Sequence, residues 1–262
     1  MNATLLPYLA LLEFRGKDAP TFLQGQLTQN VLNLNENTAC FALYCTREGR
    51  VKANFILFKK DDNFYLIVAD DLKEKIISDF KKYILRAQVF ISIKNEKIGG
   101  FFENHQREFL RIENNRIFLN NNRIIQIGGD FDFNEILQNK WRFLEIKHCL
   151  PWIMKNTSEL FTPQMLCFEN NAIDFKKGCY LGQEVIARTH YLGKSKRALF
   201  ILKSKSVLKP LDFILNKENE KIGQVLDAVF YNDEYIAAAV LKNDEIPPFL
   251  NTNGEQIENA SQ

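Results

Sequence analysis

The chain has 262 residues, of which 46% are hydrophobic and 25% charged, a composition that is ordinary for a soluble globular protein with room for more than one domain. The formal net charge of +2 is far below the basic excess of proteins that wrap nucleic acid, so direct nucleic-acid binding is not expected. The N-terminus has no basic segment before its apolar run, and no stretch reaches the roughly 18 apolar residues of a membrane span, which predicts a cytoplasmic protein without a membrane partner.

Residues up to 93 alternate between strand-like and helix-like patterns. Short apolar runs predict strands, and the capping residue Asp18 followed by Pro20 gives a helix start. Apolar side chains from Leu72 to Ile84 recur at helical spacing with lysines between them, which predicts an amphipathic helix. The expected order is a strand over 9–15, a helix from Asp18, strands over 39–45, 51–58 and 64–68, a helix over 72–84, and a strand over 89–93.

The rest of the chain divides into a weakly patterned middle and a β-rich end. Asparagine-rich turns within residues 94–140 suggest a small second α/β subdomain. From Lys196 onward the pattern predicts a small barrel or sandwich, with a hairpin turn over 231–234 and a frayed polar end in the last dozen residues. We therefore divide the chain into residues 1–192 and 193–262. The expected strands of the second part lie over 198–202, 222–225 and 235–241.

The five cysteines are widely spaced and odd in number, and no CxxC motif occurs. This pattern argues against a disulfide framework and against a tetrahedral zinc site. The histidines form no ligand pattern either. We therefore expect no metal site.

The densest unusual string is Lys176-Lys177-Gly178-Cys179-Tyr180-Leu181-Gly182-Gln183-Glu184. Neighbouring cations favour the thiolate form of a cysteine, which is the nucleophilic and metal-binding form. Gly178 and Gly182 allow a sharp turn or a close approach of the backbone to a ligand. A helix is expected to begin after Gly182, with Gln183 and Glu184 near its N-terminus and close to the sulfur. Cys179 and Lys177 are therefore the candidate catalytic residues.

The same residues also have plainer interpretations. A free cysteine is usually a small buried hydrophobe, and paired lysines usually lie on a solvated face. A nucleophilic pair of Cys179 and His190 is conceivable, but the sequence offers no third orienting residue and no oxyanion feature.

The string around Cys179 closely resembles the signature of YgfZ-type folate-binding proteins, which are related to the glycine cleavage system T-protein, an aminomethyltransferase. The resemblance continues to Gly193 and Arg197. It also covers residues 16–28, residues 83–89 and the pair Pro163-Gln164. Departures are Asn30 in place of a frequent Asp, Cys167-Phe168 in place of Asn-Leu, and a short stretch over 94–140.

This resemblance implies an α+β fold of intertwined ferredoxin-like subdomains followed by a C-terminal β-barrel, with a central channel for folate. It implies a protein that binds tetrahydrofolate and supports iron–sulfur proteins, including enzymes that thiolate tRNA. The alternative is a folate-dependent one-carbon transferase. On the family's pattern, Asn54 lies where the transferases have a catalytic carboxylate, and an amide cannot accept a proton at neutral pH. The resemblance therefore favours a folate binder without aminomethyltransferase activity.

A folate site needs an apolar wall for the pterin ring and polar groups for its edge. The resemblance assigns the wall to Trp141, and the family's second wall residue falls at Tyr8 or Leu9. Further candidates for the channel are Gln24, Gln26, Thr28, Gln183 and Glu184, with Arg188 and Arg197 as cations for the folate tail. Residues 24–28 fit equally well as the end of a capped surface helix.

Overall fold

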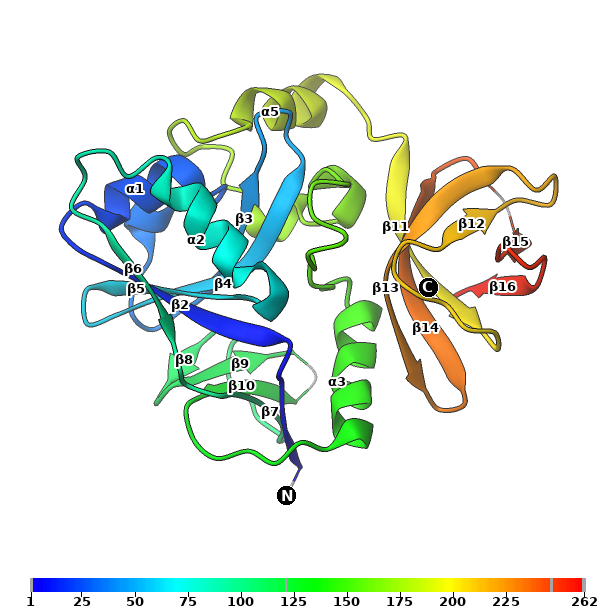
Figure 1. The fold of residues 1–262 in the computed structure, drawn as a ribbon, viewed down its shortest axis with the longest axis horizontal. Coiled ribbons are helices and arrows are strands. Elements are labelled where there is room, and N and C mark those ends of the chain that lie inside the picture. Colours follow the sequence, from blue (N-terminus) through cyan, green and yellow to red (C-terminus); the bar gives the residue numbers. More distant parts are fainter. Residues whose placement is uncertain (1, 121, 246, 261–262) are drawn as a thin grey trace.

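Two five-stranded sheets and a closed barrel make up the fold, and a computed structural model describes residues 2–120, 122–245 and 247–260 (Figure 1). The sheets lie together in one body and the barrel stands beside it, so the molecule has three lobes. No helix in the described ranges is long and apolar enough to cross a membrane. The fold is α+β with a C-terminal antiparallel barrel, as predicted.

The first lobe is the sheet β3-β4-β5-β2-β6 with two helices. Its core forms where Phe80 of the second helix meets the rings of Phe14, Phe22 and Tyr44. The predicted elements are confirmed, except that the second helix ends at Lys81 instead of residue 84. The elements are β2 (Leu9–Arg15), α1 (Ala19–Gln26), η1 (Val31–Asn33), β3 (Cys40–Cys45), β4 (Val51–Lys60), β5 (Asn63–Ala69), η2 (Asp70–Leu72), α2 (Lys73–Lys81) and β6 (Phe90–Lys94).

The second lobe is the sheet β1-β7-β10-β9-β8, backed by the helix α3. Its edge strand β1 comes from the N-terminus and pairs with β7, so the chain starts in this lobe before it enters the first. The elements are β1 (Ala3–Leu5), β7 (Ile98–Phe102), β8 (Ile112–Glu113), β9 (Arg116–Leu119), β10 (Arg123–Ile127) and α3 (Glu135–Lys147).

Asn134 caps the N-terminus of α3, and its side chain accepts a hydrogen bond from the backbone N–H of Leu137. Its Trp141 packs against Gly100 of β7, where an added Cβ would lie 2.7 Å from the indole ring. Its Phe143 stacks on Tyr231 of the barrel at 4.9 Å between ring centroids. The helix thus lies between the second lobe and the barrel (Figure 1).

A long connection from residue 148 to 196 leads to the barrel and contains η3 (Gln164–Leu166), α4 (Glu169–Ala172) and α5 (Gln183–Leu192). The predicted hairpin turn is confirmed: Asn232 and Asp233 both have positive φ, which suits a two-residue turn between antiparallel strands. The barrel strands are β11 (Arg197–Ser204), β12 (Phe213–Leu215), β13 (Lys221–Tyr231), β14 (Glu234–Lys242), β15 (Phe249–Leu250) and β16 (Gln256–Asn259).

The expectation of a frayed C-terminus is wrong for the described residues. The strand β16 pairs with both β11 and β15, and Ile257 is only 1% exposed. One apolar side chain and two strand partners are enough to order this polar segment. Residues 261 and 262 lie outside the described part of the chain.

Candidate functional site

Cys179 lies in an exposed loop between α4 and α5, and its two flanking anchors are buried. The Cys179 thiol and Gly178 are exposed, whereas Lys177 and Tyr180 are each only 7% exposed. The two buried flanking residues therefore attach the loop to the protein, and the exposed pair between them leaves Cys179 accessible to a partner. The interpretation of Cys179 as a buried structural cysteine is wrong.

Lys177 is the main anchor of this loop. Its ammonium group donates hydrogen bonds to the carbonyl oxygens of Gln24, Leu27 and Gln29 at 2.5, 2.6 and 3.1 Å, at the C-terminal end of α1. Carbonyls at a helix C-terminus have no partner within the helix, and a cation there is favourable. Burial lowers the pKa of Lys177 to about 8, and the nearby Asp174 opposes that shift. The ammonium thus joins the Cys179 loop to α1.

Gly182 ends the loop where it meets the β3–β4 hairpin. Its φ is +83°, and an added Cβ would lie 2.3 Å from the carbonyl oxygen of Thr46. On the other side of this contact, Gly49 faces the side chains of Val185 and Ile186. The glycine therefore permits a close backbone approach that fixes the start of α5 against the hairpin.

This contact predicts different effects for the two glycines of the motif. Gly182→Ala is expected to lower the free energy of unfolding by about 1–3 kcal/mol, because it forces alanine into a left-handed conformation against a backbone oxygen. Gly178→Ala is the matched control, since an added Cβ at that position meets nothing within 4 Å. Urea denaturation of the two variants measures the difference. Equal stabilities would mean that the close approach does not shape the loop.

The predicted helix after Gly182 is confirmed as α5, but its polar side chains differ in exposure. Glu184 and Arg188 are exposed, and Gln183 is half-buried. His190 stacks on Phe175 at 3.9 Å between centroids, and its Nδ1 lies 2.6 Å from Glu169 Oε1. His190 therefore holds α5 to the preceding segment, and this arrangement does not support a pair with Cys179.

Gln24 and Thr28 serve the structure of the first lobe. Gln24 Oε1 accepts a hydrogen bond from the N–H of Val31, and the Thr28 hydroxyl donates to the carbonyl of Ala172 at 2.5 Å. Gln26 Oε1 is buried without a partner among the described residues. The side-chain bonds of Gln24 and Thr28 thus favour the interpretation as a capped helix end, and they join α1 to the chain near the Cys179 loop.

A buried carboxylate, Glu145 of α3, lies where the three lobes meet. It accepts hydrogen bonds at 2.9 Å from the Nε1 of Trp141, the Nε1 of Trp152 and the hydroxyl of Tyr8. Burial raises the pKa of Glu145, although the donors and the nearby arginines oppose the shift. Burial and the adjacent Glu145 also raise the pKa of Tyr8. We call the following residues the Glu145 cluster: Tyr8, Arg123, Trp141, Arg142, Glu145, Trp152 and Asp227.

Arg123, at the start of β10, is the unsatisfied member of this cluster. Its guanidinium lies over the Trp141 ring at 5.3 Å, and the residue is 1% exposed. Its Nε and Nη1 have no hydrogen-bond partner among the described residues. By contrast, Arg142 pairs with Asp227 of the barrel strand β13. A buried guanidinium with open donors is costly unless a ligand or water supplies acceptors.

The predicted wall residues Trp141 and Tyr8 therefore do come together, through Glu145. Trp141 is fully buried, with Gly100 against its ring and Arg123 over it. Leu9 is buried in the first lobe at the start of β2. Cys179, Lys177 and Gln24 belong to a separate group around the loop.

Sequence reasoning missed most of the Glu145 cluster. Glu145 follows Trp141 by four residues, a spacing that places two side chains on one face of a helix, but the sequence pattern predicts no helix over residues 135–147. Trp152 is the only other tryptophan in the chain. Both the four-residue spacing and the second tryptophan can be seen in the sequence. Arg123 and Asp227 carry no local signal, because only the packing of the lobes brings them together.

Asn54 of β4 is buried inside the protein. Its Nδ2 donates to the carbonyl of Pro151 at 3.2 Å, and its Oδ1 accepts from the N–H of Ile153 at 2.8 Å. Both ends of the amide are therefore used to hold the segment that carries Trp152. Within the described ranges, no group of three or more His, Cys, Asp or Glu side chains is arranged to hold a metal ion.

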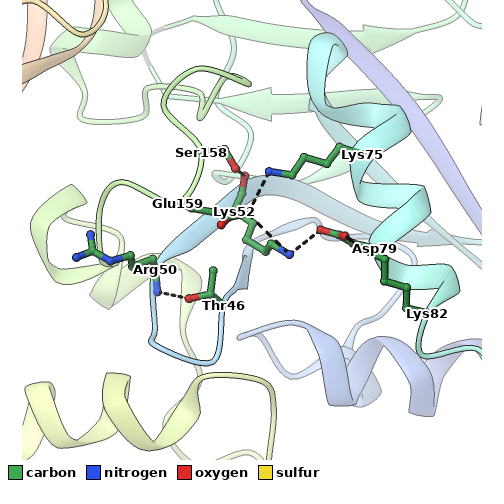
Figure 2. A network of polar contacts seen from close by, with 8 residues as sticks. All are labelled: Thr46, Arg50, Lys52, Lys75, Asp79, Lys82, Ser158 and Glu159. Atoms are coloured by element: carbon green, nitrogen blue, oxygen red, sulfur yellow. Dashed lines mark hydrogen bonds and ion pairs between the residues drawn. The ribbon is translucent and has the colours of Figure 1, made fainter.

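A network of charges fixes the hairpin that carries the Gly182 contact (Figure 2). Lys52 of β4 and Lys82 both pair with Asp79 of α2, at 2.6 and 2.7 Å. Burial would raise the pKa of Asp79, but the hydrogen bonds from both lysines lower it. Glu159 pairs with Lys75 at 3.0 Å. The network thus ties α2, β4 and the connection near residue 159 into one rigid support.

Comparisons with known proteins agree with this architecture. A protein of Haemophilus influenzae described as uncharacterized is 30% identical over 251 residues, covering 89% of this chain and 86% of the relative. The tRNA-modifying protein YgfZ of Aliivibrio fischeri is 28% identical over 264 residues, covering 90% and 83%. The protein of the same name from Escherichia coli is 27% identical over 279 residues, covering 91% and 84%.

Among solved structures, the glycine cleavage system aminomethyltransferase T from Bartonella henselae has the same fold. Its TM-score is 0.76 at 12% sequence identity, and the match covers 97% of this chain and 83% of that structure. No family model matches the chain.

Proposed function

The chain belongs to the family of YgfZ-type tRNA-modifying proteins, and from this premise we propose that it binds a reduced folate at the Glu145 cluster and supports iron–sulfur proteins through Cys179. The clients would include enzymes that modify tRNA. We place this activity in the cytoplasm, and tetrahydrofolate is the proposed cofactor.

The observation that carries the proposal is the buried guanidinium of Arg123 with two open donors. It lies beside Trp141, the Glu145 carboxylate and Tyr8. A tetrahydropterin offers the adjacent carbonyl and ring nitrogen acceptors that a forked guanidinium can bind. Binding would satisfy donors that are otherwise buried without partners.

The other residues of the cluster fit a pterin edge. Glu145 accepts three hydrogen bonds, and a carboxylate has about four lone-pair sites, so one remains for a ligand donor. The Trp141 ring is covered by Gly100 and Arg123, so it would support the pterin through the stacked Arg123. Tyr8 would lie at the same edge. Folate supplies a one-carbon carrier when bound, and the residues described here only bind and orient it.

Cys179 is proposed as the group that acts on the client. Its exposure suits contact with a second protein, and a thiol is a ligand and nucleophile for sulfur or iron. The buried anchors Lys177 and Tyr180 would hold the loop in one position for that contact. In this proposal folate binds at the buried Glu145 cluster, and the client protein contacts the thiol at the surface.

The one-carbon transferase is the less favoured alternative. Asn54 has both amide ends committed to the backbone of Pro151 and Ile153 and cannot accept a proton there. No other buried carboxylate replaces it at that position on β4 in the described chain. An assay for aminomethyl transfer to tetrahydrofolate discriminates the two functions.

Removing Arg123 is expected to separate binding from stability. Arg123→Met should weaken tetrahydrofolate binding by about 1.5–3 kcal/mol, the usual contribution of hydrogen bonds from a charged group. The same change removes unpaired buried donors but also one of the two cations beside buried Glu145, so we expect only a small change in melting temperature, because Arg142 and three hydrogen bonds still stabilise the carboxylate. Both tryptophans of the chain donate to Glu145, so their fluorescence reports on the site directly.

Titration of wild type and Arg123→Met by fluorescence and calorimetry is the test, with Arg107→Met as the control at an exposed arginine paired to Glu113. A wild-type protein that binds no reduced folate would overturn the proposed function. Equal affinities in wild type and Arg123→Met would show that the Arg123 guanidinium does not bind the folate.

A further inference from the structure

A groove of about 310 Å³ separates the barrel from the first lobe and its connection. Three cations line it: Arg50 from the hairpin turn, and Arg197 and Lys221 from the barrel. Its apolar lining includes Leu160, Phe161 and Phe213. No acidic residue is among the lining residues that the structure describes. We call this the interlobe groove.

The charges of the groove are not neutralised by the described residues. Arg50 donates through Nη1 to the carbonyl of Leu160, and Arg197 donates through Nη1 to the carbonyl of Ile222 at 3.1 Å. Lys221 lies over the Phe213 ring at 3.7 Å. These contacts orient the cations but leave most of their donors open, so the groove has the charge to hold an anion.

Arg50 points away from the charge network of its own hairpin. Figure 2 shows its guanidinium on the opposite side of β4 from the Lys52–Asp79 pair. The pKa of the exposed Glu48 in the same turn is lowered by a hydrogen bond from Thr46 and also by the nearby Arg47 and Arg50, but Glu48 does not line the groove. The cation is therefore available to the groove.

Two segments run from the Glu145 cluster to the interlobe groove. On β13, Asp227 contacts the cluster and Gly223 lines the groove, four residues or about 13 Å along a strand. On β4, Asn54 holds the segment of Trp152, and Val51 pairs with Phe161 of the groove, three residues or about 10 Å away. The linker from the pterin ring through the methylene, the p-aminobenzoyl group and the amide bond to the first glutamate has a length of this order.

A second opening beside α3 is larger, about 850 Å³, but its charges balance. Lys147 and Lys203 line it together with Glu234 and Glu258, and Lys203 pairs with Glu234 at 3.4 Å. An anionic chain gains little from such a lining. The interlobe groove has three cations and no acid, so it is the better exit for the carboxylate end of a ligand.

We propose that the interlobe groove binds the glutamate tail of the folate held at the Glu145 cluster, and selects folates that carry several γ-linked glutamates. This inference rests on the proposed folate function. Each added glutamate brings one carboxylate, and Arg50, Arg197 and Lys221 would receive them along the groove. The tail would then emerge beside the hairpin that supports the Cys179 loop.

The test compares tetrahydrofolate carrying one glutamate with tetrahydrofolate carrying several, by calorimetry on the full chain. Wild type is expected to bind the long form tighter by roughly two- to fivefold per contacted carboxylate, as for partly solvated ion pairs, and salt should reduce this preference. The double variant Arg197→Gln/Lys221→Gln should lose the preference. Lys221→Gln alone should reduce the preference for the long form. Because the Lys221 side chain is exposed, this change should not disturb folding.

Lys203→Gln, in the charge-balanced opening, is the matched control and should retain the full preference. Equal affinity of wild type for the two folates would overturn the inference while leaving the folate site intact. A preference lost only in Lys203→Gln would also overturn it. A single-stranded RNA that bound wild type and not the double variant, with no effect of tail length, would assign the groove to nucleic acid instead. Failure of both folates to bind would count against the proposed function itself.

Discussion

Cys179→Ser is expected to fold normally, to bind folate as wild type does, and to fail completely in restoring iron–sulfur enzyme activity to cells that lack the protein. Cys179 is exposed, so serine neither opens a cavity nor removes a buried contact. The hydroxyl stays neutral and is a poor ligand for iron or sulfur, so only the chemistry of the thiol is lost. Complementation, melting temperature and folate affinity measured on one pair of proteins check this result.

Cys167 provides the matched control, because it is also exposed and lies in the same connection. Cys167→Ser should complement fully. Burial raises the pKa of the Cys40 thiol to about 12 and also raises the pKa values of Cys45 and Cys149, so these three should react slowly with an alkylating reagent. A serine variant at Cys179 that complements, or a Cys167→Ser variant that fails, would contradict the assignment.

Lys177→Met is expected to destabilise the protein by about 3 kcal/mol and to abolish complementation through loss of the loop position. The change leaves the carbonyls of Gln24, Leu27 and Gln29 without the ammonium that they now share. Unpaired buried carbonyls and the loss of a charged donor have costs of this size. Lys176→Met is the control, because Lys176 is exposed and this variant keeps Lys177. Denaturant unfolding measures both.

The difference in stability between wild type and Lys177→Met is expected to depend on pH in a defined direction. The folded-state pKa of Lys177, about 8, lies below the value of about 10.4 expected for an unfolded chain. Between these values the unfolded chain binds the proton more tightly, so unfolding becomes less favourable as pH rises. The stability advantage of wild type over Lys177→Met should therefore grow from pH 8 toward pH 10. A constant or shrinking advantage would show that Lys177 is not buried as described.

Local sequence determined most of the elements and the identity of the loop. Periodicity placed β2, β3, β4, β5 and the hairpin at residues 231–234, because each depends on neighbouring residues and on turn chemistry. The resemblance around Cys179 indicated the family and the α+β fold, and Gly182 marked the start of α5. The polar composition of the last residues was misleading, because Ile257 alone orders β16 once the barrel offers it two partners.

Only the tertiary structure decided what the individual side chains of the site do. The sequence suggested that Lys177 acts on the adjacent cysteine, but the packing of α1 against the loop gives its ammonium three carbonyl partners. The sequence predicts only that Asn54 lies in a strand. The structure adds that its amide holds the backbone on both sides of Trp152.

The Glu145 cluster and the interlobe groove likewise could not be predicted from local sequence. Tyr8, Arg123, Glu145 and Asp227 are far apart in the chain and meet because three lobes converge on α3. The three groove cations likewise come from two lobes. Periodicity and motifs report on near neighbours, whereas burial, unpaired donors and unbalanced charge arise only when distant segments pack together.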